Sequence, residues 1–214
     1  MQAGTISYGS TYTAQIEKLS FAQEGGINIT HGFINVAGDS NHIDISQMVI
    51  KSENGTFIEG DATLPLTFAT KSNGKIEASL TAHIDKRDTR GFITTAQKEQ
   101  LASLPDSLLD SHIEVCGTLA DIKIDTAALS VPNIATLHIK GSIKEITDDK
   151  KREVAITLDG ILENLTPLFG KSPKKVVPLT INGEATATIT TGDYLVSTAK
   201  LTNENGFEII QIGA

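Results

Sequence analysis

The chain has 214 residues, a formal net charge of −8, 39% apolar residues and 21% charged residues. This composition excludes a disordered chain, and no apolar run approaches the ~20 residues of a membrane-spanning helix. The acidic balance disfavours a nucleic-acid partner, because phosphate binding requires clustered Lys and Arg. The single cysteine, Cys116, excludes an internal disulfide.

Residues 5–84 predict a series of strands, because β-branched residues are abundant and turn signals recur. The turn signals are Glu24-Gly25-Gly26, Gly38-Asp39, Asn54-Gly55 and Asn73-Gly74. The expected strands are Thr5–Tyr12, Gln15–Phe21, Gly26–Val36, Asn41–Lys51, Thr56–Ala69 and Lys75–Ile84. Pro65 lies inside one of these runs, so we expect that strand to be at an edge or to be bulged there.

Residues 88–110 predict the one helical insertion. Thr94 or Thr95 is a suitable N-cap, helix formers follow from Ala96 to Leu104, and Pro105 can open a second helical turn over Asp106 to Leu109. The expected apolar stripe consists of Phe92, Ala96, Leu101, Leu104 and Leu108. We expect this insertion to cover one end or edge of the sheet; a gating role is the alternative.

Strands resume at Ser111, and from there a short unit recurs: an apolar residue, any residue, Gly, any residue and an apolar residue. This period-2 pattern is typical of a strand with one buried face. Leu119 and the next apolar residue, Ile122, cannot both face inward on one straight strand, so we expect a bend or bulge at Ala120-Asp121. Recurrence of that bend predicts a curved sheet, a trough, with glycines at the bends. These glycines are Gly117, Gly141, Gly160 and Gly183.

The same alternation predicts which side chains point inward. The expected inward set is Ile113, Val115, Leu119, Ile122, Ile124, Leu137, Ile139, Ile143, Ile156, Leu158 and Ile181. If two walls meet, these residues fill the core of a closed β-sandwich ~10 Å thick. If the walls stay apart, they form an apolar surface above the few hundred Å² that monomers usually expose, and such a surface needs a ligand.

The sequence shows no arrangement typical of a catalyst. None of the five histidines has a second metal ligand at zinc-finger or metalloprotease spacing. His42 and Asp44, like His112 and Glu114, share a strand face, but alternation produces such pairs freely. Cys116 is expected to be a small outward-facing residue. We therefore predict no enzyme activity, no cofactor and no metal; an enzyme on a parallel β-helix would need clustered acids.

The repeat glycines, the segment LPDSLL at 104–109 and the pattern VPLTINGEATATITTGDYLVSTAKLTNENGFEIIQ at 177–211 together resemble the TamB family of bacterial envelope proteins, which is related to AsmA. The segment 135–170 is similar to a repeat of that family. The resemblance covers residues 100–214; residues 1–90 share only the general strand-rich character of the family. The chain differs in lacking a membrane anchor, the family's end domain and a visible signal peptide, so we expect either a cytosolic protein or, as the resemblance favours, a fragment of a longer chain.

The resemblance implies one repetitive all-β domain over 1–214, an elongated trough called a β-taco, in the periplasm of a Gram-negative bacterium. The full-length protein would be anchored in the inner membrane. The implied function is carriage of phospholipid acyl chains between the inner and outer membranes, with a BamA-like barrel as a further partner. An outer-membrane protein assembly factor and a closed β-sandwich binding or adhesion module are the alternatives.

Overall fold

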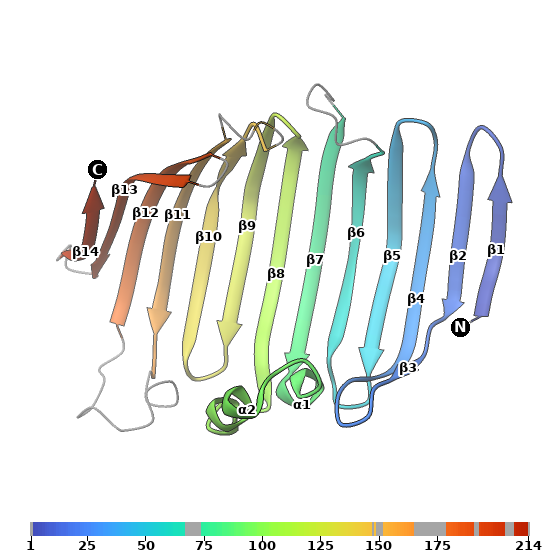
Figure 1. The fold of residues 1–214 in the computed structure, drawn as a ribbon, viewed down its shortest axis with the longest axis horizontal. Helices are drawn as coiled ribbons and strands as arrows, with labels where there is room; N and C mark the ends of the chain where they lie inside the picture. Colours follow the sequence, from blue (N-terminus) through green and yellow to red (C-terminus); the bar gives the residue numbers. More distant parts are fainter. Residues whose placement is uncertain are drawn as a thin grey trace.

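A computed structural model describes residues 2–66, 74–146, 148, 152–164, 179–190, 193–203 and 208–213. Within these residues the strands form one fourteen-stranded sheet in which neighbours in sequence pair antiparallel; only the short β3 lies off this path, on β4 (Figure 1). The strands are β1 (Gln2–Tyr8), β2 (Tyr12–Lys18), β3 (Phe21–Ala22), β4 (Asn28–Gly38), β5 (His42–Ser52), β6 (Phe57–Pro65), β7 (Lys75–Asp85), β8 (Ser107–Thr118), β9 (Asp121–Val131), β10 (Ala135–Lys144), β11 (Arg152–Leu162), β12 (Leu179–Thr190), β13 (Asp193–Asn203) and β14 (Glu208–Gly213).

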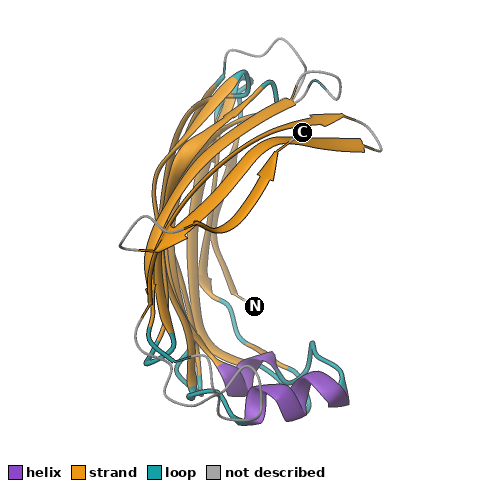
Figure 2. Ribbon diagram, turned by 90° about the vertical axis from the view of Figure 1, so that its left-hand side faces the viewer, coloured by secondary structure: helices purple, strands orange, loops and turns teal. Residues whose placement is uncertain are grey.

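The sheet is open and curved, with a concave and a convex face (Figure 2). The helices α1 (Lys86–Thr89) and α2 (Thr95–Ala102) lie between β7 and β8 and project from the strand ends toward the concave side. The predicted fold class, an all-β curved trough with a short helical insertion, is therefore confirmed. Neither helix of the described residues has the length and apolar character needed to cross a membrane.

The curvature coincides with β-bulges inside strands. In β5, Ile45 pairs with Ala62 but Met48 pairs with Gly60, so one extra residue is inserted, and Gln47 there has a φ of 55°. In β9, Asp125 is the extra residue relative to both β8 and β10. Bulges increase local twist and bend a strand, which is how a wide sheet acquires curvature.

The expected bend at Ala120-Asp121 is wrong. Leu119 and Ala120 form a two-residue turn between β8 and β9, and Gly117 pairs with Ile122 across that hairpin. The spacing of apolar residues changes between Leu119 and Ile122 because the chain reverses direction there. The inward-facing residues before and after this change belong to two different strands. The same holds at Ile143, one residue before the end of β10; the third slip, at Leu165, lies outside the described residues.

Three of the repeat glycines, Gly117, Gly141 and Gly160, lie where strands approach each other on the concave face. A Cβ added at Gly141 would clash with the carbonyl oxygen of Ala155 and lie 2.9 Å from the Cα of Ile156, both on the neighbouring strand. At Gly117 the added Cβ would clash with the carbonyl oxygen of Asp121, and the φ of 131° is one that L side chains rarely adopt. At these two positions the backbone itself requires glycine.

Several predicted boundaries are also wrong. The first expected strand divides at Gly9 into β1 and β2. Pro65 is neither at a sheet edge nor at a bulge: it is the last residue of β6, an inner strand, opposite His42. Its missing N–H costs little at a strand end. The Asn54-Gly55 turn is confirmed between β5 and β6, whereas Asn73 lies outside the described residues.

The helical insertion is partly as predicted. Thr94 is the N-cap of α2 and forms a capping box with Gln97. The expected apolar stripe packs only in part: Phe92 is 70% exposed and Ala96 is exposed, whereas Leu101, Leu104 and Leu108 are half-buried. The second helical turn is wrong, because residues from Ser107 onward pair with β7 and form β8. Both helices cover strand ends; the edges of the described sheet are β1 and β14.

Replacing Gly141 by Val is expected to destabilise the fold by about 1–3 kcal/mol although Val favours strands, because the added Cβ meets backbone that cannot move aside. Ala155→Val, on the outer face of the adjacent strand, is the matched control and should change the free energy of unfolding by less than about 0.5 kcal/mol. Chemical denaturation measures both. A Gly141→Val variant as stable as the control would show that the close approach does not constrain the sheet.

Candidate functional site

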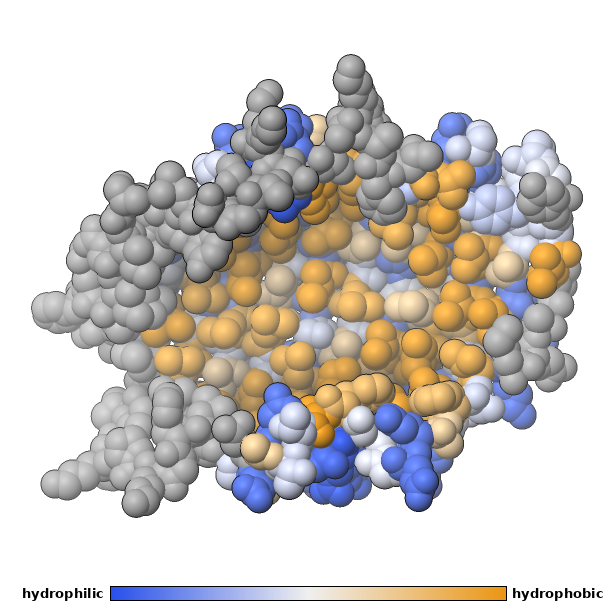
Figure 3. All heavy atoms as spheres, in the orientation of Figure 1, coloured by the Kyte–Doolittle hydropathy of each residue, from blue (hydrophilic) through white to orange (hydrophobic). Residues whose placement is uncertain are grey.

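The concave face, called the inner face below, is apolar from one side of the sheet to the other. Strand register joins apolar residues and one glycine in a row across consecutive strands. This row is Ile6, Ala14, Val36, Ile45, Ala62, Ala78, Val115, Ile124, Gly141, Ile156 and Ala185. A parallel row contains Met48, Gly60, Leu80, Ile113, Ala127, Ile139, Leu158 and Gly183. Figure 3 shows the resulting hydrophobic surface.

Nothing in the described part of the chain covers this face. Among the described residues, the buried hydrophobic side chains are only Ile76, Ala82, Leu119, Ile134 and Ile181, besides Pro65. Along β11 the inner-face residues are half-buried or, at Gly160, buried, while the residues of the opposite, outer face are exposed. A closed sandwich would bury the inner residues almost completely. The inner face is instead accessible from the open side of the trough.

The sequence-predicted inward residues lie together, with one exception. Register places those of β8 to β12 on the inner face, and Gly117, Gly141, Gly160 and Gly183 lie on it as well. Leu119 lies in the turn after β8, where it is 3% exposed, so it packs at the rim instead of forming trough surface.

The inner-face residues of β2 to β7, such as Ile45, Ala62 and Leu80, were not among the predicted site residues. The prediction followed the glycine-centred repeat, which is clearest after residue 111. Simple alternation in Ile58-Glu59-Gly60-Asp61-Ala62 would have identified this half of the surface.

The outer face carries three histidines that lie next to carboxylates, including the pairs expected from the alternation of side chains along a strand. His42 Nε2 lies 3.1 Å from Asp44 Oδ2, and His112 Nε2 lies 3.2 Å from Glu114 Oε1. His83 Nδ1 lies 2.6 Å from Asp110 Oδ1. No group of three or more candidate metal ligands occurs among the described residues. These pairs are local contacts between neighbouring side chains of the sheet.

Cys116 also faces outward, on the row opposite Lys123. Its Sγ donates a hydrogen bond to Asp125 Oδ2 at 2.9 Å. That hydrogen bond, together with burial and the charge of Asp125, raises the pKa of the Cys116 thiol. A raised thiol pKa lowers the thiolate fraction at neutral pH, so Cys116 is a weak nucleophile.

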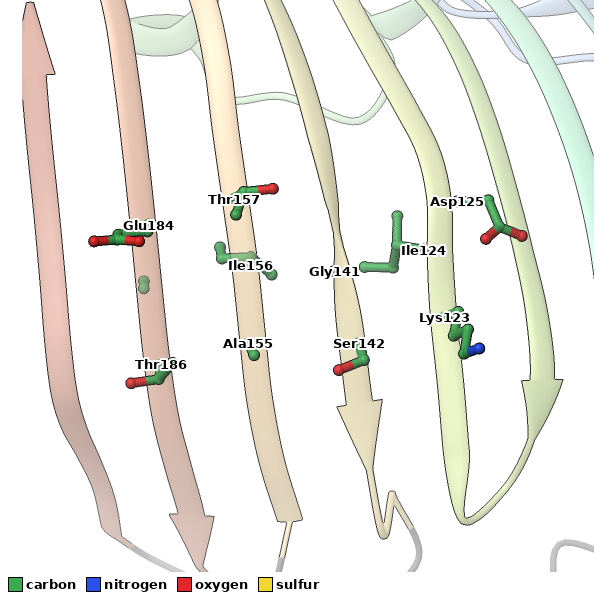
Figure 4. A pocket seen from close by; sticks show the side chains of 11 residues that line it. Lys123, Ile124, Asp125, Gly141, Ser142, Ala155, Ile156, Thr157, Glu184 and Thr186 are labelled. Atoms are coloured by element: carbon green, nitrogen blue, oxygen red, sulfur yellow. The ribbon is translucent and has the colours of Figure 1, made fainter.

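Two open depressions lie on the outer face. The larger, of about 550 Å³, extends over β9 to β12 and presents Lys123, Asp125 and Glu184 (Figure 4). The smaller, of about 260 Å³, contains His83, Asp110 and His112. The sheet separates both from the apolar inner face, so they do not extend that surface.

The helical rim of the trough is fixed by two buried carboxylates. Asp88 accepts hydrogen bonds from Ser52 Oγ and, at 2.7 Å, from Asn54 Nδ2, which ties α1 to the β5–β6 turn. Asp85 accepts the backbone N–H of Arg87 at 2.8 Å and pairs with its guanidinium at 2.7 Å. Both carboxyl groups are almost fully buried. The rim is therefore a defined part of the fold.

These contacts set the pKa values of the two carboxyls. Burial alone would raise the pKa of Asp88, but hydrogen bonds from Ser52, Thr56 and Asn54 outweigh it and the pKa is lowered. Hydrogen bonds from Arg87 lower the pKa of Asp85 against the opposing effect of burial.

Comparisons with protein-family models, curated proteins and solved structures found no match for this chain.

We expect the rim to loosen in acid. Because both carboxyls have lowered pKa values in the folded state, their contribution is complete above the unfolded pKa and is lost as pH falls through the folded pKa, that is below about pH 4. Asp88→Asn should reduce stability by about 1–3 kcal/mol at neutral pH, because the amide nitrogen cannot accept a hydrogen bond. Amide hydrogen exchange of α1 and thermal unfolding at pH ~6 and pH ~3 measure these effects.

The matched control is Asp61→Asn, which removes one exposed carboxylate from the outer face. It should leave exchange at α1 unchanged. Equal protection of α1 in the two variants would contradict the anchoring role of Asp88.

Proposed function

We propose that the inner face binds phospholipid acyl chains and carries them along the trough between two membranes. The observation that carries this proposal is the uncovered apolar row that begins at Ile6 and reaches Ala185. An apolar surface of this extent is unstable in water unless a partner or ligand covers it. Acyl chains fit, because the inner face offers aliphatic side chains and few directional groups.

The dimensions support several chains in line. Neighbouring strands lie about 4.8 Å apart, so thirteen paired strands give a trough roughly 58 Å long. One leaflet of a bilayer core is about 15 Å thick, so one acyl chain occupies only part of that length. The trough would therefore hold a series of lipids.

The energetics favour binding without fixing a position. Burial contributes about 0.8 kcal/mol per CH₂, so a sixteen-carbon chain gains on the order of 12 kcal/mol before the costs of ordering. Contacts with Ile, Leu, Val and Ala are non-directional, and adjacent strands offer nearly equal surfaces. A lipid can therefore slide across the strands down a concentration gradient, and this transport needs no catalytic residue.

The resemblance of 100–214 to the TamB family supports a location in the periplasm, as part of a longer protein anchored in the inner membrane. A BamA-like outer-membrane barrel is then a proposed partner. The alternative function of a sandwich-type adhesion module would need a second layer on the inner face, and the described strands form one sheet.

Leu158→Asp tests the proposal, with Thr157→Asp as its control. Leu158 lies on the inner face opposite Ile139, and Thr157 is the next residue on the same strand but faces outward. In an open trough the new carboxylate of Leu158→Asp reaches water, so stability should fall by less than the several kcal/mol of a buried unpaired charge. Lipid loading, measured by native mass spectrometry, should fall sharply in Leu158→Asp and remain in Thr157→Asp.

Ile139→Asp should behave like Leu158→Asp. Unfolding of both inner variants together with an absence of bound lipid in the unmodified chain would contradict the proposal. Equal lipid loading in Leu158→Asp and Thr157→Asp would also contradict it, because the inner face would then not be the binding surface.

A further inference from the structure

The helical rim contains a cleft of about 460 Å³ between α1 and α2. It is lined by three basic residues, one acid and three apolar residues. The lining consists of Lys86, Arg90, Ile93, Lys98, Leu101, Ala102 and Asp106. Three cations facing one acid give the cleft an excess positive charge, although the whole chain carries a formal net charge of −8.

Two of the three cations lack a compensating charge. Lys86 Nζ lies 3.3 Å from Asp106 Oδ1 and also donates a hydrogen bond to the backbone oxygen of Leu104. Across the described parts of the chain, no ion pair involves Arg90 or Lys98, and both residues are exposed. The nearby Arg87 is already held by Asp85. Arg90 and Lys98 are thus available for an anion.

The cleft lies beside the apolar inner face. Lys86 follows directly on β7, whose last inner-face residue, Ile84, pairs with Leu109 of β8. The helices project toward the open side of the trough (Figure 2), and hydrophilic residues border the hydrophobic surface along this rim (Figure 3). A molecule with acyl chains on the inner face and its polar end at the opening would bring that end close to the helices.

We propose that this cleft binds the phosphate of a membrane phospholipid headgroup while the acyl chains lie on the inner face. The inference rests on the proposed function and adds a site for the headgroup, so that phosphate-bearing lipids are preferred over neutral lipids with the same chains. Arg90 offers a planar fork of donors that suits phosphate oxygens, and Lys98 adds a second charge. Lys86 can exchange its exposed partner Asp106 for the phosphate.

Such a site would give a lipid that slides along the inner face one preferred binding position on an otherwise uniform apolar surface. Because Arg90 and Lys98 are exposed, their attraction for phosphate is screened by salt, with a Debye length of about 10 Å at 0.1 M. Binding of a phosphate-bearing lipid should therefore weaken with ionic strength, and binding of a neutral lipid should not.

The test compares phosphatidic acid with a diacylglycerol of identical chains, each displacing a fluorescent fatty acid from the protein. The test variant carries Arg90→Gln and Lys98→Gln. The control carries Lys123→Gln and Lys140→Gln, an equal change of charge on the outer face. Thermal unfolding checks that both variants are folded. The unmodified protein should bind phosphatidic acid roughly fivefold or more tightly than diacylglycerol.

The test variant should lose this preference and the control should keep it. Equal affinity for the two lipids in the unmodified protein, or an unchanged preference in the test variant, would overturn the headgroup site and leave the proposed function standing. If neither lipid displaced the probe, the proposed function itself would fail. Inorganic phosphate that competes as well as phosphatidic acid would identify a free-phosphate site and would also overturn the proposal, as would tighter binding of an acidic peptide.

Discussion

The structure depends on one constraint: a single antiparallel sheet has one apolar face and the described residues provide no second layer to cover it. Hydrophobic burial would favour closing such a sheet or stacking it on another copy. The bulges at Gln47 and Asp125 bend the sheet instead, and Gly117 and Gly141 allow neighbouring strands to approach closely. The inner face is then a trough, and its free energy is lowered by whatever apolar ligand enters.

The two faces of the sheet have separate roles because strand side chains alternate. Polar residues of the outer face contact one another, across strands as in the pair His83–Asp110 and along one strand as in the pair His112–Glu114. On the inner side, charge is concentrated at the helical rim, where Asp88 anchors α1 and where Arg90 and Lys98 have no ion-pair partner in the described chain. An apolar surface bordered by unpaired cations matches an amphipathic anion better than a neutral hydrocarbon.

Much of the inner face could be predicted from sequence, because period-2 alternation identifies a face without any knowledge of strand pairing. Ile139 and Leu158, predicted separately, are direct partners in the sheet. The turn at Leu119-Ala120 could not be recognised, since it contains no Gly, Asn, Asp or Pro, and its phase slip resembled a bend. The bulge at Asp125 moves the inward positions from Ile122 and Ile124 to Ala127 and Leu129, but the two neighbouring alanines, Ala127 and Ala128, obscure that shift in the sequence.

The structure of the helical rim could not be predicted from sequence for other reasons. Ser107 to Asp110 would suit a helical turn locally, but pairing with β7 gives their backbone groups strand partners, so tertiary contacts decide. The cleft depends on how α1 and α2 meet, which spacing along the chain does not specify. Residues with an ordinary sequence context, such as Arg90, acquire a role only through that packing.

The most direct test of the central claim is a photo-crosslinking scan along β11, with a photoreactive residue placed at each position from 153 to 159 in turn and lipid labelled in its acyl chains. The account predicts period-2 crosslinking: lipid attaches at positions 154, 156 and 158, which face the trough, and not at 153, 155, 157 or 159. Crosslinking without this alternation, or an absence of lipid at all three inner positions, would contradict it.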